Sequence, residues 1–307
     1  MGADGTVTLR ELLAEATDRC RAAGLPSPES DARRIVEEVA GADATELALV
    51  LDDPVTELRM ARFDGMLARR CSGEPLQYVL GRWGFRTLDL MVDRRVLVPR
   101  PETEVVAGLA IAEVDRLGGR DLPTTVVDLG CGSGAIGLSV AVERVRTSVW
   151  MTDVSEDALA VARANTVGVG RAASRVRTAV GPWFEALPDG LRGAVHVVVS
   201  NPPYVDRAVS LPPEVADWEP AGALWADDAG TADLRHLVAG AGDWLVDDGA
   251  LVLELSPEQA DVLREVALGH FAEVSVEPDL TGRARALVAR GPRRAVADPA
   301  GPAPTAE

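Results

Sequence analysis

Apolar residues in the first eighty positions recur three and four residues apart, as on one face of an amphipathic helix. Thr8 and Glu11 have the spacing of a capping box that opens the first helix. The apolar stripe of that helix consists of Leu9, Leu12, Leu13, Ala16 and Cys20. Similar patterns predict further helices at about 27–41, 45–51 and 55–70. We therefore expect residues 1–81 to form a small helical domain.

Between residues 83 and 98 the apolar positions alternate in short runs, which is typical of strands. Asp93-Arg94-Arg95 separates two of these runs. We therefore expect a β-hairpin linker over residues 82–98 with its turn at 93–95. Pro99 and Pro101 then interrupt the chain before a helix that begins near Glu102.

From about residue 124 onward, short β-rich runs alternate with helical runs. The expected strands lie at 125–127, 148–151, 176–180, 195–200, 250–255, 271–276 and 285–289. Such alternation predicts an α/β fold with a doubly wound, mostly parallel sheet of seven strands over residues 99–290. The last two strands are too close in sequence for a crossover helix, so we expect them to be antiparallel.

The C-terminal residues 291–307 carry four prolines, no aromatic residue and neither Leu nor Ile. This composition cannot bury a core, and we expect the segment to be a disordered tail.

The overall composition narrows the possible partners. The chain has 48 acidic and 31 basic residues, all of the latter arginine, and a formal net charge of −17. This charge disfavours direct binding to nucleic acid, which needs a basic surface. No apolar run approaches the ~18 residues of a membrane-spanning helix, and the start of the chain lacks a secretory signal pattern. The three cysteines have neither metal-ligand nor disulfide spacing, so we expect no metal and a cytoplasmic location. We also expect the protein to be a monomer.

A glycine-rich segment follows the first strand of this alternating region. Gly132, Gly134 and Gly137 fit G-x-G-x-x-G, the dinucleotide fingerprint. Alternatively, Asp128, Gly130, Gly132 and Gly134 fit D-x-G-x-G-x-G, which resembles motif I of the S-adenosylmethionine methyltransferases. In both families an acidic residue that ends the next strand, here Asp153, binds ribose hydroxyls. The segment by itself leaves both interpretations open.

Asn201-Pro202-Pro203-Tyr204 follows the fourth strand and resembles the N-P-P-Y motif of methyltransferases that act on planar nitrogens. The target of such enzymes is either adenine N6 or the glutamine side-chain amide. An amide nitrogen is a poor nucleophile because resonance occupies its lone pair. The Asn201 side-chain oxygen and the Pro202 carbonyl can accept its two N–H groups and orient it, while Tyr204 can stack on the planar group.

Several further segments indicate which nitrogen is methylated. Residues 74–81, 96–104, 128–134, 153–155, 201–204, 218–220 and 280–283 together resemble the release-factor glutamine methyltransferases, the HemK/PrmC family. The resemblance implies a class I S-adenosylmethionine methyltransferase, with a Rossmann-like sheet and a small helical domain in front. It also implies N5-methylation of the glutamine in the Gly-Gly-Gln loop of a peptide chain release factor, a protein of translation termination that the helical domain would grip.

The resemblance implies a role for each motif residue. Asp128, Gly130, Cys131, Gly132, Ser133, Gly134, Asp153, Trp183 and Asn201 would bind S-adenosylmethionine, with Asp153 at the ribose and Trp183 against the adenine. The substrate would contact Arg100, Glu102, Thr103, Asn201, Pro202, Pro203 and Tyr204. The catalytic residues would be Asn201, Pro202 and Tyr204.

Three other functions are compatible with parts of this pattern. A DNA N6-adenine methyltransferase would share the chemistry of residues 201–204 but predicts a basic surface. The chain departs from the family pattern at Pro182, where an aspartate is common, and in the stretch 227–233. These departures suit either a divergent release-factor enzyme or a paralogue with another substrate, and Pro182 keeps open a methyltransferase of a small amide or amine. A binding module that retains the fold would bind the cofactor without transferring its methyl group.

Overall fold

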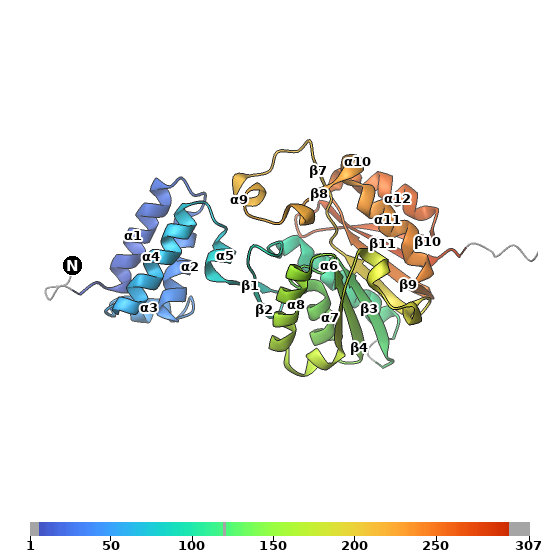
Figure 1. Cartoon of the computed structure of the whole chain (residues 1–307), viewed down its shortest axis with the longest axis horizontal. Helices are drawn as coiled ribbons and strands as arrows, with labels where there is room; N and C mark the ends of the chain where they lie inside the picture. The colour runs from blue at the N-terminus through green and yellow to red at the C-terminus, as the bar shows by residue number, and fades with distance from the viewer. Residues whose placement is uncertain (1–5, 119–120, 295–307) are drawn as a thin grey trace, which may run out of the picture. The chain divides into compact units, whose positions relative to one another are not determined.

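The computed structural model describes residues 6–118 and 121–294 of the 307-residue chain. The described residues form two compact units, which Figure 1 draws with their helices and strands. The first comprises residues up to Gly84, together with Asp89–Val98 and Ser210–Ala221. The second comprises Phe85–Leu88 and the described residues of 99–209 and 222–294. None of the described helices is long and apolar enough to cross a membrane.

The first unit is built mainly from helices. These are α1 (Leu9–Ala22), α2 (Pro28–Ala40), α3 (Leu47–Val50), α4 (Glu57–Cys71) and α5 (Leu76–Leu80). The predicted capping box is present: Thr8 Oγ1 accepts from the Glu11 amide at 3.3 Å, and the Glu11 carboxylate accepts from the Thr8 amide at 2.9 Å. The short helix α5 was not predicted.

Helices α1, α2 and α4 pack together around a continuous apolar core. Ile35, Phe63 and Leu67 are fully buried in this core, as are the α1 residues Leu9 and Leu12. Burial of these faces is the main source of the unit's stability, because each fully buried large apolar side chain contributes about 1.5–3 kcal/mol relative to exposure.

The linker is a hairpin, but its turn is not where we expected it. Strands β1 (Arg82–Phe85) and β2 (Leu88–Met91) pair, so the turn of the hairpin lies at Arg86-Thr87, and the prediction that the hairpin turns at 93–95 is wrong. Residues 92–100 contain no strand. The Val96 carbonyl accepts a hydrogen bond from the Tyr78 hydroxyl at 2.6 Å, which replaces the strand partner that the alternation had suggested.

Residues 210–221 belong to the first unit although they follow the fourth strand of the sheet in sequence. They include α9 (Pro213–Ala216). The Arg94 guanidinium lies 5.7 Å from the ring centroid of Trp218, and the Glu219 carboxylate accepts from the Val98 amide at 3.4 Å. The sequence had given no sign of this grouping.

The second unit contains the predicted seven-stranded sheet, in the order β10-β11-β9-β6-β3-β4-β5. The strands are β3 (Thr124–Leu129), β4 (Thr147–Asp153), β5 (Val176–Val180), β6 (Val195–Ser200), β9 (Leu245–Glu254), β10 (Phe271–Pro278) and β11 (Ala284–Pro292). Strand β11 runs in the opposite direction to the other six strands of this sheet. The predicted antiparallel pairing of the last two strands is therefore confirmed. Two short strands, β7 (Val205–Asp206) and β8 (Trp225–Ala226), form a separate parallel pair.

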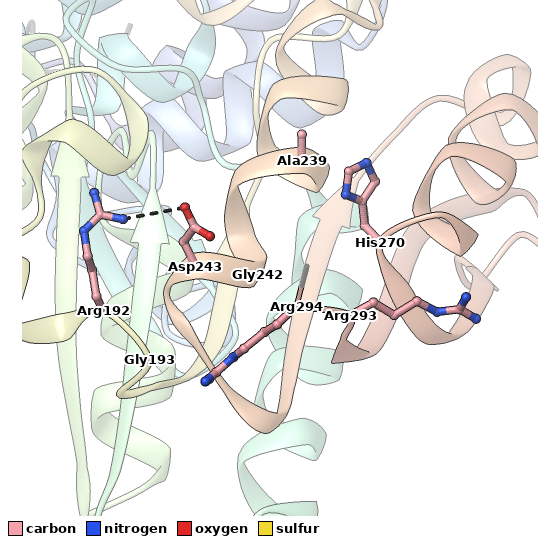
Figure 2. A pocket seen from close by; sticks show the side chains of 8 residues that line it. All are labelled: Arg192, Gly193, Ala239, Gly242, Asp243, His270, Arg293 and Arg294. Carbon is pink, nitrogen blue, oxygen red and sulfur yellow. Dashed lines mark ion pairs between the residues drawn. The ribbon is translucent and has the colours of Figure 1, made fainter. Parts of the chain in front are cut away.

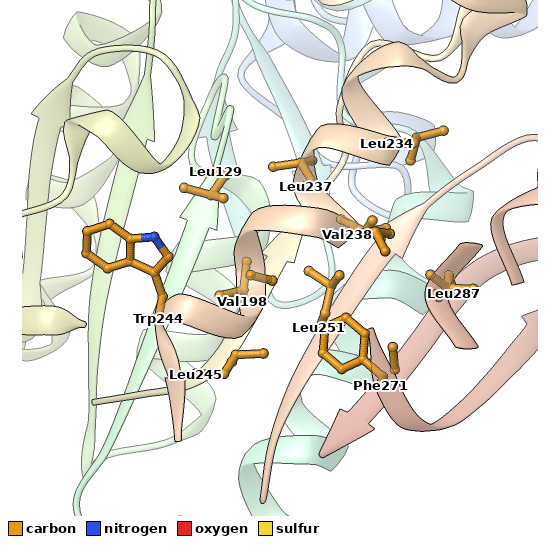
Figure 3. Packing of buried hydrophobic residues seen from close by; sticks show 14 of the residues in the cluster. Leu129, Val198, Leu234, Leu237, Val238, Trp244, Leu245, Leu251, Phe271 and Leu287 are labelled. Atoms are coloured by element: carbon orange, nitrogen blue, oxygen red, sulfur yellow. The ribbon is translucent and has the colours of Figure 1, made fainter. Parts of the chain in front are cut away.

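Helices cover the sheet on both faces. They are α6 (Pro101–Arg116), α7 (Ala135–Glu143), α8 (Glu156–Gly168), α11 (Ala232–Gly240) and α12 (Ala260–Leu268). The short α10 (Asp227–Gly230) contacts α11 and the β7–β8 pair instead. Figure 3 shows Leu237 of α11 beside Leu129 of β3, and Leu234 of the same helix belongs to the same buried cluster as Val198 and Leu251 of the sheet. Successive residues of a strand point to opposite faces of the sheet. Val126 and Val197 are as fully buried as the residues next to them, so both faces of the sheet are covered at β3 and β6.

The end of the chain differs in part from the prediction. Strand β11 continues to Pro292, which pairs with Phe271, so the expected disorder of residues 291 and 292 is wrong. The next two residues are also described: the Arg293 amide donates to the His270 carbonyl at 2.7 Å, and the Arg294 guanidinium donates to the Leu245 carbonyl at 3.2 Å, so their expected disorder is wrong as well. Residues 295–307 of the predicted tail lie outside the described residues.

Candidate active site

The predicted motifs come together at one edge of the sheet. The glycine loop follows β3, Asp153 ends β4, and Asn201 follows β6. These three strands are mutually parallel, and β9 is parallel to β6, so their carboxyl ends lie on the same side. In an open α/β sheet this is the edge at which ligands bind.

The glycine loop is held to the next strand by Asp153. Gly130, Gly132 and Gly134 adopt positive φ values of 68°, 54° and 83°, which favour glycine. The Gly132 amide donates to Asp153 Oδ2 at 2.9 Å, and the Ser155 amide donates to Oδ1 at 2.9 Å. Burial raises the pKa of Asp153, while these amide hydrogen bonds oppose the rise.

Asp128 supports the same loop from inside the unit. It is 1% exposed, and its Oδ2 accepts from the Gly137 amide at 2.8 Å. Its Oδ1 has no hydrogen-bond partner among the described residues. Burial, with a smaller contribution from the charge of Asp153, raises the pKa of Asp128 to about 7. A Cβ at Gly137 would lie 2.8 Å from Met151 Cγ. The close approach of α7 to β4 at this point therefore requires glycine at position 137.

The loop leaves room for a ligand on one side. A Cβ placed on Gly132 would meet no heavy atom of the described residues within 4 Å, whereas one on Gly130 would lie 3.3 Å from the Trp183 ring. Cys131 and Ser133 are buried in the loop, and Asn165 Nδ2 donates to the Ser133 carbonyl at 2.9 Å. An open glycine backbone beside carboxylates and an aromatic ring fits a planar base and a cationic group such as a sulfonium.

Trp183 has an unusual local conformation. Its φ is 42°, in the left-handed region that a bulky residue rarely adopts. It follows Pro182 and begins a 3₁₀ turn that extends to Ala186. The carboxylate of Asp233 accepts a hydrogen bond from its indole, and burial raises the pKa of that carboxyl. Asp233 lies in the stretch 227–233 that departs from the family pattern, so this stretch contributes directly to the surroundings of Trp183.

The residues of the N-P-P-Y motif are joined by hydrogen bonds to residues of three other elements, α6, β9 and the 3₁₀ turn Pro257–Gln259. Asn201 Nδ2 donates to Thr103 Oγ1 at 3.2 Å, and the Thr103 hydroxyl donates to Glu254 Oε2 at 2.7 Å. The Tyr204 hydroxyl donates to Glu254 Oε1 at 3.0 Å. The Tyr204 carbonyl accepts from Gln259 Nε2 at 2.8 Å. Pro202 is buried and Pro203 is partly buried.

Burial affects the two acidic groups in this network. Burial raises the pKa of Glu254, while the hydrogen bonds from Thr103 and Tyr204 oppose the rise. The pKa of Tyr204 is also raised, by burial and by the nearby Glu254 carboxylate. Tyr204 is therefore a neutral hydrogen-bond donor at physiological pH.

The predicted residues at the start of α6 are brought to the site to different degrees. Thr103, in the first turn of the helix, is buried and contacts Asn201 directly. Glu102 is partly exposed, and its charge contributes to the raised pKa of Glu254. Arg100 is the N-cap residue of the helix, with an extended backbone.

Sequence reasoning missed three residues that support the motif. Glu254 is 1% exposed at the end of β9, Gln259 bonds the Tyr204 carbonyl, and a Cβ on Gly230 would lie 2.2 Å from that carbonyl oxygen. The sequence did contain a signal for the first: an acidic residue ends an otherwise apolar run, Leu251-Val252-Leu253-Glu254, at the same sheet edge.

A cavity in the second unit lies elsewhere, as Figure 2 shows. Its lining residues are Arg192, Gly193, Ala239, Gly242, Asp243, His270, Arg293 and Arg294. Most of these precede β6, β9 and β10, so the cavity lies at the edge where the parallel strands begin, opposite the motifs. Arg192 pairs with Asp243 at 3.7 Å and lies 4.4 Å from the Trp244 ring centroid. Within residues 6–118 and 121–294, no cluster of three His, Cys, Asp or Glu residues could hold a metal ion.

Comparison with known proteins identifies both parts of the chain. Residues 11–81 match the PrmC N-terminal domain, and residues 114–213 match the methyltransferase small domain. A release factor glutamine methyltransferase of Agrobacterium fabrum is 35% identical over 94% of this chain and 99% of its own length. Those of Deinococcus radiodurans and Streptomyces coelicolor are 39% and 38% identical, over 92% and 91% of this chain and 98% and 96% of their own lengths.

Among solved structures, a methyltransferase from Pyrococcus furiosus aligns with 19% identity and a TM-score of 0.47, over 77% of this chain and 98% of its own. The sheet order and the methyltransferase domain make the second unit a class I methyltransferase, with S-adenosylmethionine as its cofactor. The full-length similarity to the curated relatives, together with the assembled N-P-P-Y site, shows that this chain belongs to the release factor glutamine methyltransferase family.

Proposed function

We propose that this protein methylates the side-chain nitrogen of a glutamine in a peptide chain release factor, the one in its Gly-Gly-Gln loop. The observation that carries this proposal is the orientation of Asn201. Its amide nitrogen is engaged by Thr103 at 3.2 Å, so its Oδ1 is the atom left to accept a hydrogen bond from a substrate. An acceptor is what the N–H groups of a glutamine amide require.

The cofactor roles follow the geometry of the loop. We assign the backbone of Gly130 to Gly134 to the amino-acid part of S-adenosylmethionine and Trp183 to its adenine. Each Asp153 oxygen accepts one backbone amide, at 2.9 Å, and keeps further acceptor capacity for the ribose hydroxyls. Asp128 stabilises the loop by accepting from the Gly137 amide, and its ionised form would complement the positive charge of the donor.

The protein's own residues prepare the glutamine nitrogen for attack. The bound donor supplies an electrophilic methyl group on its sulfonium sulfur. Asn201 Oδ1 and the Pro202 carbonyl would accept the two N–H groups and stabilise the positive charge that develops on the nitrogen. The glutamine nitrogen would release one N–H proton to solvent in exchange for the methyl group that the donor would supply. Tyr204, fixed by Glu254 at 3.0 Å, would stack on the planar amide.

The test combines purified protein, S-adenosylmethionine and a release factor from the same cell, and maps any added methyl group by mass spectrometry. We expect one methyl group on the glutamine of the Gly-Gly-Gln loop. Asn201→Ala should abolish transfer while cofactor binding, measured by calorimetry, persists. A methyl group elsewhere, or normal transfer by Asn201→Ala, would refute the assigned mechanism.

The same assay separates the other functions. Transfer to adenine in duplex DNA would indicate the DNA enzyme, which the net charge of −17 disfavours. Transfer to a low-mass amide by protein that ignores the release factor would indicate a small-molecule enzyme. Cofactor binding without transfer to any of these would indicate a binding module. We further propose that the protein acts in the cytoplasm. We also propose that it is a monomer, and sedimentation analysis would test the oligomeric state.

A further inference from the structure

We propose that Glu254 fixes the orientation of the Asn201 side-chain amide through Thr103, and so acts as a positioning residue for the nitrogen that accepts the methyl group. The expected effect on the rate of methyl transfer rests on the proposed function, whereas the positioning of Asn201 does not. Its structural basis is a chain of three side chains from three elements: the end of β9, the first turn of α6 and the loop after β6. The two links measure 2.7 Å and 3.2 Å.

The direction of the chain follows from what each group can donate and accept. The Thr103 hydroxyl donates its single proton to Glu254 Oε2 at 2.7 Å, an oxygen that only accepts in the carboxylate form. With its proton given to Glu254, the Thr103 hydroxyl oxygen can act only as a hydrogen-bond acceptor towards Asn201. Asn201 must therefore present its NH₂ group to Thr103, and its Oδ1 must point the other way. The carboxylate thus selects one of the two possible orientations of the amide.

The surroundings of Glu254 support its acceptor role. It is 1% exposed, so water does not compete for its two oxygens. Its second oxygen accepts from the Tyr204 hydroxyl at 3.0 Å. Burial raises the pKa of Glu254, and the positive charge of Arg285, whose side chain is 13% exposed and pairs with Asp279, is among the contributions that oppose the rise. One buried carboxylate therefore holds both the first and the last residue of the N-P-P-Y motif.

Two substitutions should interrupt the chain in different ways. Glu254→Gln keeps the size of the side chain but can donate as well as accept, so Thr103 is no longer forced to donate to it. Thr103→Val keeps the shape of residue 103 but removes the hydroxyl. In both variants Asn201 is free to rotate its amide. Thr103→Ser retains the hydroxyl and should rescue the orientation.

The kinetic experiment measures methylation of the release factor by wild-type protein and these variants. We expect kcat to fall by roughly 10- to 100-fold in Glu254→Gln and Thr103→Val, the scale of a misplaced reacting group. Cofactor affinity should stay unchanged, and Thr103→Ser should recover most of the activity. Glu113→Gln is the matched control, because Glu113 is a buried carboxylate that pairs with Arg116 and Arg290 instead.

A second measurement needs no substrate and separates this inference from the proposed function. The side-chain NH₂ signals of Asn201, assigned by their loss in Asn201→Ala, report its hydrogen bond to Thr103 in ¹⁵N-labelled protein. We expect Glu254→Gln and Thr103→Val to shift or broaden these signals, and Glu113→Gln and Thr103→Ser to leave them in place. Unchanged signals in Glu254→Gln would overturn the inference whatever the substrate proves to be. Changed signals with wild-type kcat on a methylated release factor would overturn its kinetic part.

Discussion

Asp128 should make the stability of the second unit fall as the pH rises. Its pKa in the folded protein is raised from 3.8 to about 7, mainly because the carboxyl is buried at 1% exposure. The folded state therefore binds the proton more tightly than the unfolded state between these two values. Stability falls with pH wherever the folded state holds more protons. Asp128→Asn removes the titration and keeps an acceptor for the Gly137 amide.

The size of the effect follows from the same two pKa values. The difference between 3.8 and about 7 corresponds to about 4 kcal/mol in total. Of this, about 2.5 kcal/mol is lost by the wild-type protein between roughly pH 5 and pH 8. The variant should gain stability over the wild type by that amount across the interval. For a unit of this size the gain corresponds to about 5–10 °C in Tm.

Thermal unfolding of both proteins at pH 5 and pH 8 measures this difference. Asp279→Asn is the control, because the hydroxyl and amide of Thr281 lower the pKa of Asp279 to about 2. The stabilisation that the ionised Asp279 contributes is lost only as the pH falls from about 4 to about 2. The control should therefore differ from wild type by the same amount at pH 5 and pH 8. An Asp128→Asn variant whose Tm difference from wild type is the same at both pH values would refute the reasoning, because Asp128 would then be ionised throughout.

Three other outcomes are expected. Gly230→Ala should reduce kcat or prevent folding of the loop after β6, because the new Cβ would lie 2.2 Å from the Tyr204 carbonyl oxygen at a residue with φ of 80°; transfer assays and circular dichroism measure this, and a fully active variant would contradict it. Thr8→Ala should cost about 1 kcal/mol in urea unfolding of the first unit, through loss of the cap on α1; an unchanged midpoint would contradict the assignment of the cap. Binding of the positively charged S-adenosylmethionine should release protons near pH 7 because it favours the ionised form of Asp128; calorimetry in buffers of different ionisation enthalpy measures this, and no buffer dependence would count against it.

The sheet could be predicted because each of its strands carries its own pattern. Val126 and Val127 are both buried in β3, and the run of three valines before Ser200 is buried in the same way in β6. A strand covered on both faces needs an unbroken apolar run, which is visible without any alignment. The glycine loop was visible for a similar local reason, since three closely spaced positive φ values require glycine.

The hairpin turn could not be predicted because contacts far away in sequence decide it. Arg86 adopts a φ of 52°, which is unfavourable for its type. Its amide donates to the Glu104 carboxylate at 2.9 Å, and its guanidinium pairs with Glu143 at 2.7 Å. Asp93, where the turn was expected, instead accepts from the amide of Arg95 at 3.0 Å and forms a small local turn. Alternation alone does not distinguish these two arrangements.

The site shows why a motif can be found from sequence while its support cannot. Asn201 is followed directly by two prolines and a tyrosine, so the whole motif can be found in four consecutive residues of the sequence. Glu254 lies 53 positions later and becomes relevant only because β9 is parallel to β6 and ends at the same edge. An acidic side chain at 1% exposure is costly unless its oxygens are bonded, and here both accept from residues of the site. The cost of burying this carboxylate is thus offset by the hydrogen bonds that orient Asn201 and Tyr204, which links the stability of this edge to the geometry that catalysis requires.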